Sequence, residues 1–130
     1  MKKEQLIQLT PEEELQTIID KAKKKHGRVY KTIIADEVII WRLLKRSEFK
    51  DIMNQVVYVQ NEVIDEEGNA KMVDVIDEDA TYDLRQEAIA KAVILYPSGI
   101  VENMAAVADI ISTECMLKSG FGETPVTEQC

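Results

Sequence analysis

The spacing of apolar and polar positions first changes at Gly27. Before it, four apolar residues recur on one helical face: Leu15, Ile18, Ile19 and Ala22. Thr10 and Glu13 can form a capping box around Pro11, a residue that suits the first position of a helix. Glycine often ends helices because it tolerates the left-handed backbone there. The pattern therefore predicts a helix over residues 11–26.

Two β-favouring runs follow, residues 28–34 and 38–44, separated by the polar residues 35–37. Two such runs around a short break predict a hairpin. A two-stranded hairpin is barely stable alone, so we expect it to pack on helices or to join another chain's sheet. Ser47 then begins a short predicted helix with one apolar face, made by Phe49, Ile52, Met53 and Val56.

Residues 61–80 are strongly acidic, with eight acidic residues against one lysine. Apolar residues lie on both sides of Gly68, a pattern typical of a small hairpin. A mobile insertion would have the same composition, because like charges repel one another and little apolar area is available. Both interpretations stay open.

The last third of the sequence is helical in pattern. Thr81 can cap a helix that begins near Tyr82 and ends before Pro97, which cannot continue a helix. A longer helix is predicted from Ile100 to Lys118, with apolar residues on more than one side. Such a helix is central in its domain or is covered by another subunit. We therefore expect an oligomer or an obligate complex.

These elements predict a single α+β domain, mainly helical, with a β-hairpin packed on three or four helices. Its expected parts are an N-terminal arm and helix (1–27), a hairpin and helix (28–60), an acidic insertion (61–80), C-terminal helices (81–122) and a tail (123–130).

Composition narrows the function classes. The chain has 130 residues, 45% of them hydrophobic, and a net charge of −8. No apolar run approaches the roughly 20 residues of a membrane helix, so no membrane partner is expected. The acidic stretch disfavours nucleic acid, because phosphates would meet carboxylates. Two cysteines fit a reducing compartment better than a disulfide scaffold, which predicts a cytoplasmic protein.

The sequence offers no set of catalytic or metal-ligating residues. His26 is the single histidine, and the end of a helix accounts for it. Cys115 and Cys130 lack partners at metal-ligand spacing. A calcium loop around Gly68 would begin at Val63, which supplies no side-chain oxygen. We therefore expect no enzyme activity, no metal and no cofactor.

The order of elements resembles a family of small proteins encoded among the tail genes of contractile-tailed bacteriophages. In that family a hairpin leads into the pattern aromatic-Arg-x-Leu-x-Arg-x-Glu-aromatic, and two helices follow, separated by Tyr/Trp-Pro and ended by Ser-Gly-Phe. The resemblance covers about residues 27–122. The matching segments are GRVYK (27–31), DEVIIWRLLKRSEF (36–49), Glu87-Ala88, Tyr96-Pro97 and Ser119-Gly120-Phe121.

The resemblance implies a non-enzymatic role in tail or baseplate morphogenesis, as an assembly factor, a tail assembly chaperone or a minor virion component. The partners would be other phage tail or baseplate proteins, met in the host cytoplasm or in the virion tail. Tryptophan and arginine are enriched at binding hot spots, and the candidate contact residues are Trp41, Arg42, Phe49 and Phe121. The alternative is a small acidic regulatory protein that binds a basic host protein through residues 61–80.

Overall fold

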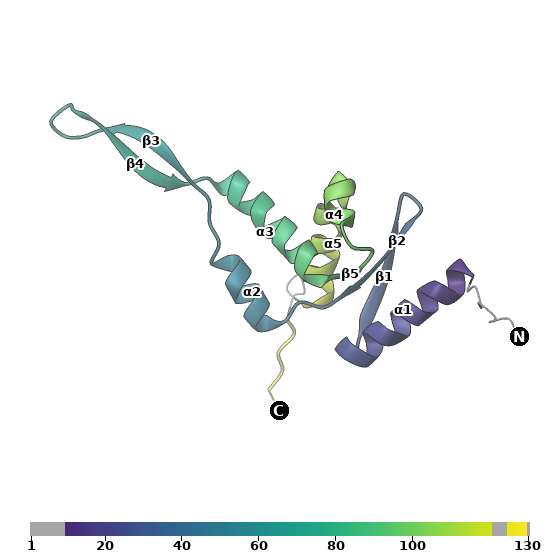
Figure 1. The fold of residues 1–130 in the computed structure, drawn as a ribbon. Coiled ribbons are helices and arrows are strands. Elements are labelled where there is room, and N and C mark those ends of the chain that lie inside the picture. Colours follow the sequence, from purple (N-terminus) through teal and green to yellow (C-terminus); the bar gives the residue numbers. More distant parts are fainter. Residues whose placement is uncertain (1–9, 121–124, 130) are drawn as a thin grey trace, which may run out of the picture.

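The computed structural model describes residues 10–120 and 125–129. Figure 1 shows helices gathered around a small sheet, with one hairpin, β3–β4, extending away from them. The predicted α+β class is confirmed. Within the described residues the elements are α1 (Pro11–His26), β1 (Val29–Ile34), β2 (Glu37–Arg42), α2 (Arg46–Met53), β3 (Tyr58–Ile64), β4 (Ala70–Ile76), α3 (Glu78–Val93), β5 (Ile94–Tyr96), α4 (Ile100–Asn103) and α5 (Ala105–Lys118).

The first hairpin forms as predicted and gains a third strand. β1 and β2 pair antiparallel with Ile34 opposite Glu37, so the turn consists of Ala35 and Asp36. Both turn residues have positive φ, 48° and 68°, as a two-residue hairpin turn requires. β5, which the sequence pattern did not predict, pairs antiparallel with β2 and gives the strand order β1-β2-β5.

The core lies against the central strand of this sheet. Ile39, Ile40 and Trp41 are three consecutive buried residues of β2, although neighbouring side chains point to opposite faces. Ile39 and Trp41 belong to the main core, with residues of α2, α3, α4 and α5. Ile40 of β2 and Ala22 of α1 are also buried, but they lie outside that core. Helices therefore pack on both faces of the sheet at β2, while Ile33 of β1 stays exposed. One of these helices is α1, which lies along β1 (Figure 1).

Local sequence signals determine α1. The Glu13 N–H donates to the Thr10 hydroxyl at 3.1 Å, and the Thr10 N–H donates to the Glu13 carboxylate at 3.3 Å, which completes the predicted capping box. Gly27 has φ +82°, and its N–H donates to the Lys23 carbonyl at 2.8 Å. The helix begins and ends at the predicted residues.

Several helix boundaries differ from the prediction. α2 begins at Arg46, before the predicted start Ser47, and ends at Met53, so Val56 lies outside it. α3 ends at Val93, because Ile94–Tyr96 forms β5.

α3 begins at Glu78, because the Asp77 carboxylate caps it by accepting the Ala80 N–H at 3.0 Å. The predicted cap, Thr81, is buried inside the helix. The single helix predicted over residues 100–118 is two helices, because Met104 is extended (φ −131°) and separates α4 from α5.

Candidate functional site

The structure accounts for Trp41 by packing within the domain. Its side chain is 1% exposed and stacks on Tyr30, with ring centroids 4.8 Å apart. The indole N–H donates to the Thr32 hydroxyl at 2.8 Å. A buried indole commonly finds such a partner, because an unpaired polar group in the core is costly.

Arg42 joins three elements. Its guanidinium donates two hydrogen bonds to the Glu48 carboxylate of α2, at 2.8 and 2.7 Å, and one to the Ala92 carbonyl of α3 at 2.7 Å. The hydrogen bond to Glu48 raises the pKa of Arg42, and that from Arg42 lowers the pKa of Glu48 to about 2. With side chains only 13% and 28% exposed, this pair links β2, α2 and α3.

The other two candidate contacts are placed differently. Phe49 is half-buried and packs against the main core. Phe121 lies outside the described residues. The structure thus brings Trp41, Arg42 and Phe49 together in and around the core, and the binding role of all four residues stays a prediction.

The largest exposed feature is the β3–β4 hairpin, residues 58–76, called here the acidic hairpin. Its two strands pair only with each other, so each has an unpaired outer edge among the described residues. Of the two interpretations of residues 61–80, a hairpin or a mobile insertion, the structure therefore shows the hairpin. The hairpin begins earlier, at Tyr58, and ends at Ile76, while residues 78–80 belong to α3.

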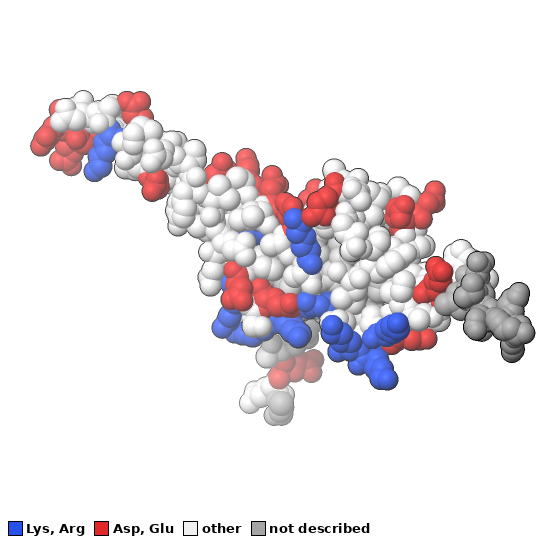
Figure 2. All heavy atoms as spheres, viewed as in Figure 1, with Lys and Arg blue, Asp and Glu red and all other residues white. Residues whose placement is uncertain are grey.

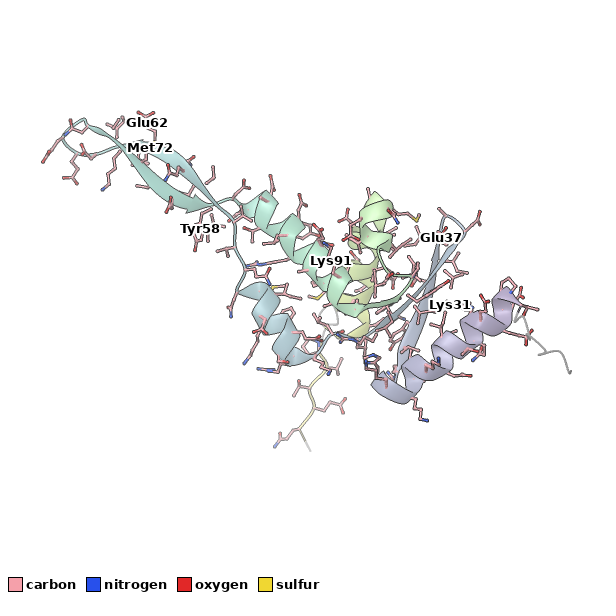
Figure 3. All side chains as sticks on the ribbon, viewed as in Figure 1. Lys31, Glu37, Tyr58, Glu62, Met72 and Lys91 are labelled. Atoms are coloured by element: carbon pink, nitrogen blue, oxygen red, sulfur yellow. The ribbon has the colours of Figure 1, made fainter. Side chains whose placement is uncertain are left out.

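Strand register divides the acidic hairpin into two faces. On one face Val59 is opposite Val75, and Val63 and Val73 follow along the same face. On the other face Tyr58 is opposite Ile76, Glu62 is opposite Met72 and Ile64 is opposite Ala70. Figure 3 shows Glu62 and Met72 next to each other, with Tyr58 nearer the helices.

Large apolar side chains of the acidic hairpin are open to solvent. Ile64 is 65% exposed, Tyr58 60% and Met72 57%. Met72 and Ile64 are neighbours on one face, and a hydrogen-bonded polar pair separates them from Tyr58. Exposed apolar patches with a polar rim are typical of binding sites. The sequence signal that could have located this surface was the set of apolar residues on both sides of Gly68.

The outer loop of the acidic hairpin concentrates negative charge. The Asp65 carboxylate accepts the N–H groups of Glu67 and Asn69 at 2.9 and 2.8 Å. Gly68 has φ +84°, which permits the tight return of the chain. The Asp65 carboxylate is thus bonded within the turn, whereas the side chains of Glu66 and Glu67 are exposed at the loop surface. Figure 2 shows acidic atoms gathered at this end.

The base of the acidic hairpin is held to α3. The Asp77 N–H donates to the Val57 carbonyl at 2.8 Å, so the two chain ends of the hairpin meet. The Thr81 hydroxyl accepts the Val57 N–H at 2.8 Å. Arg85 donates to the carbonyls of Met53 and Gln55, at 2.7 and 3.1 Å. These bonds fix the point where the hairpin leaves the domain.

Replacing Thr81 with valine should destabilise the protein by about 1–3 kcal/mol, because the Val57 N–H loses its buried acceptor. Urea denaturation followed by circular dichroism measures this change. Thr17→Val is the matched control, since the exposed Thr17 hydroxyl donates only to a carbonyl of its own helix, at 2.9 Å from Glu13. Equal stability losses in both variants would contradict the anchoring role of Thr81.

A second feature is a hollow of about 270 Å³ between the end of α1 and the segment after β2, called here the basic hollow. Its lining residues are Lys25, His26, Arg28, Arg42, Leu43, Leu44 and Lys45. Burial lowers the pKa of His26, and the positive charges of Arg42, Lys25 and Lys45 lower it further. The fold thus joins two basic clusters that are separate in the sequence.

A third feature is another hollow, of about 310 Å³, which lies among α2, α3 and α5 and is mainly apolar. Met53, Ile89 and Met116 line it, and the Ser112 hydroxyl donates to Gln86 at its edge. Among the residues that the structure describes, no group of three or more His, Cys, Asp or Glu side chains could hold a metal ion. In the same described ranges, every helix is too short or too polar to span a membrane.

Comparisons of the chain with protein-family models, with curated proteins and with solved structures find no match.

Proposed function

We propose that this protein is a non-enzymatic binding protein and that the acidic hairpin is the element that docks its partner. The observation that carries the proposal is the exposure of Tyr58, Ile64 and Met72 on a two-stranded sheet that extends away from the helices (Figure 1). Hairpins of this kind are marginally stable in isolation, and exposed apolar side chains gain free energy when a partner covers them.

The chemistry of the hairpin defines the partner that it fits. Unpaired strand edges can take up a further strand, which gives affinity through backbone hydrogen bonds. The apolar faces favour a partner with apolar side chains, and the acidic loop favours basic residues at its rim. We include in the same proposal that this docking serves tail or baseplate assembly, the role that a resemblance of residues 27–122 to phage tail proteins would imply.

The alternative function, regulation of a basic host protein, has its own supporting observation. The loop carboxylates of Glu66 and Glu67 lie at the end farthest from the helices, where a basic surface can reach them (Figure 2). The alternative requires the loop charges, whereas tail assembly through the apolar faces requires the strands. Binding that disappears in Glu66→Gln/Glu67→Gln but persists in Ile64→Ser would favour the alternative.

Replacing residues 58–76 with a Gly-Ser-Gly linker should leave the midpoint of thermal unfolding nearly unchanged, because the hairpin packs little on the domain and its chain ends already meet at Val57 and Asp77. The same change should abolish binding to tail or baseplate proteins. Differential scanning calorimetry and titration calorimetry with those purified proteins measure the two effects. A variant that unfolds at a much lower temperature would show that the hairpin belongs to the core.

A matched pair of point variants separates the hairpin from the rest of the surface. Ile64 is 65% exposed on the hairpin, and Ile33 is 61% exposed on β1. Ile64→Ser should weaken partner binding by about tenfold, as for an apolar residue at a binding hot spot. Ile33→Ser should bind as the unmodified protein does. Equal binding by both variants would contradict docking through the hairpin.

A further inference from the structure

We infer that the acidic hairpin of one copy docks in the basic hollow of a second copy, so that the protein assembles head to tail. This inference rests on the proposed docking function of the hairpin and adds a second copy of this chain as a partner. It joins two exposed surfaces of opposite charge.

The charges of the two surfaces are complementary. Residues 58–76 contain five acidic residues and one lysine. The basic hollow is lined by Lys25, Arg28 and Lys45, none of which forms an ion pair with a described carboxylate. Arg42 is already paired with Glu48 and adds little net charge. Three cations without an ion-pair partner are therefore available to a ligand of opposite charge. The loop glutamates of the hairpin can supply that charge.

The fold prevents the hairpin from reaching its own hollow. Figure 1 shows β3–β4 directed away from α1, whose end borders the hollow. In Figure 2 the acidic end of the hairpin lies at the upper left, and basic side chains gather along the lower edge of the molecule, below α2 and α1. The Val57–Asp77 and Val57–Thr81 hydrogen bonds fix the base of the hairpin. Contact between these surfaces must therefore join different copies.

Apolar contact supplements the charges. Leu43 and Leu44 contribute the apolar part of the hollow, and the exposed Met72 and Ile64 lie beside the acidic loop. Because different surfaces of the two copies meet, the contact leaves one free hairpin and one free hollow. Repetition of such a contact generates a ring or a filament.

Two neutralised variants test this contact. The hairpin variant carries Glu62→Gln, Glu66→Gln and Glu67→Gln, and the hollow variant carries Lys25→Gln, Arg28→Gln and Lys45→Gln. The Lys45 backbone N–H, which donates to Glu48 at 2.8 Å, remains in the hollow variant. Sedimentation velocity at low salt measures the size of each species. The unmodified protein should associate with increasing concentration and dissociate with added salt.

Each variant alone should self-associate at least about tenfold more weakly, because one side of every contact is neutralised. An equimolar mixture should form a 1:1 dimer, because only the intact hairpin of one variant and the intact hollow of the other remain complementary. That dimer cannot extend. A control with Lys31→Gln, Lys50→Gln and Lys118→Gln removes equal charge outside the lining of the hollow and should associate like the unmodified protein.

Other outcomes overturn the inference. If the unmodified protein is a monomer at all concentrations, a second copy is excluded as the partner. If the hollow variant associates as strongly as the unmodified protein, the copies meet through another surface than the hollow. If in either case the Gly-Ser-Gly variant still loses binding to a tail protein, the proposed function stands and only this inference fails. If the Gly-Ser-Gly variant also keeps that binding, docking through the hairpin is wrong as well.

Discussion

Trp41→Ala is expected to destabilise the protein by about 3–5 kcal/mol, the usual cost of removing a large buried aromatic side chain. The indole is 1% exposed, stacks on Tyr30 and bonds to Thr32, so its loss leaves a cavity and an unpaired hydroxyl. A domain of this size is commonly stable by about 5–15 kcal/mol in total. Urea denaturation followed by far-UV circular dichroism measures the loss without relying on tryptophan fluorescence.

Trp41→Phe is the control for this prediction. Phenylalanine keeps an aromatic ring against Tyr30 but has no N–H for the Thr32 hydroxyl. The expected loss is about 1–2 kcal/mol, from the missing hydrogen bond and the smaller ring. If Trp41→Ala lost no more stability than Trp41→Phe, the interpretation of Trp41 as a core residue would be wrong.

Glu48→Gln should destabilise the protein by about 2–3 kcal/mol near neutral pH, and this difference should disappear in acid. The hydrogen bond from Arg42 lowers the pKa of Glu48 to about 2 in the folded protein, against an ordinary value of 4.5. A lowered folded pKa stabilises the native state above the unfolded pKa. The contribution of Glu48 is therefore complete above about pH 4.5 and is lost as the pH falls to about 2.

Urea midpoints of the unmodified protein and Glu48→Gln, measured across this pH range, give the difference directly. Glu102→Gln is the control, because Glu102 pairs with Lys91 at 3.2 Å on the exposed surface, where ion pairs contribute little. A difference between Glu48→Gln and the unmodified protein that stays constant from neutral pH to pH 2 would show that the carboxylate charge is not its cause.

Elements with local signals could be predicted from the sequence. The bounds of α1 follow from Thr10, Glu13 and Gly27, which act within one or two helical turns. The first hairpin follows from two β-favouring runs around the short break at residues 35–37, which the structure shortens to the two-residue turn Ala35-Asp36. Both predictions rest on residues that are close in the sequence and do not depend on contacts between distant segments.

Elements that depend on distant contacts could not be predicted. Ile94–Tyr96 continues the apolar pattern of α3, and only pairing with Ile40 and Trp41 makes it a strand. Met104 has helix-compatible neighbours, and no proline or glycine there signals the break between α4 and α5. Thr81 has the chemistry of a cap, but the hydrogen bond with Val57 gives it a different role.

The candidate site shows the same division. Trp41 and Arg42 have the residue types of a binding hot spot, but side-chain type does not reveal burial, and the fold places both inside the domain. The acidic hairpin is visible in the sequence as a run of acidic residues with apolar residues on both sides of Gly68. The basic hollow is not, because Lys25 and Lys45 come together only after α1 packs along β1.

The meeting of Val57 and Asp77 at the base of the hairpin has an evolutionary consequence. Residues inserted or deleted between these two positions need not move the rest of the chain, since the ends remain joined. The entropic cost of a longer segment grows only with the logarithm of its length. The hairpin can therefore change in length and composition without disturbing the rest of the domain, and the choice of partner can change without a new fold.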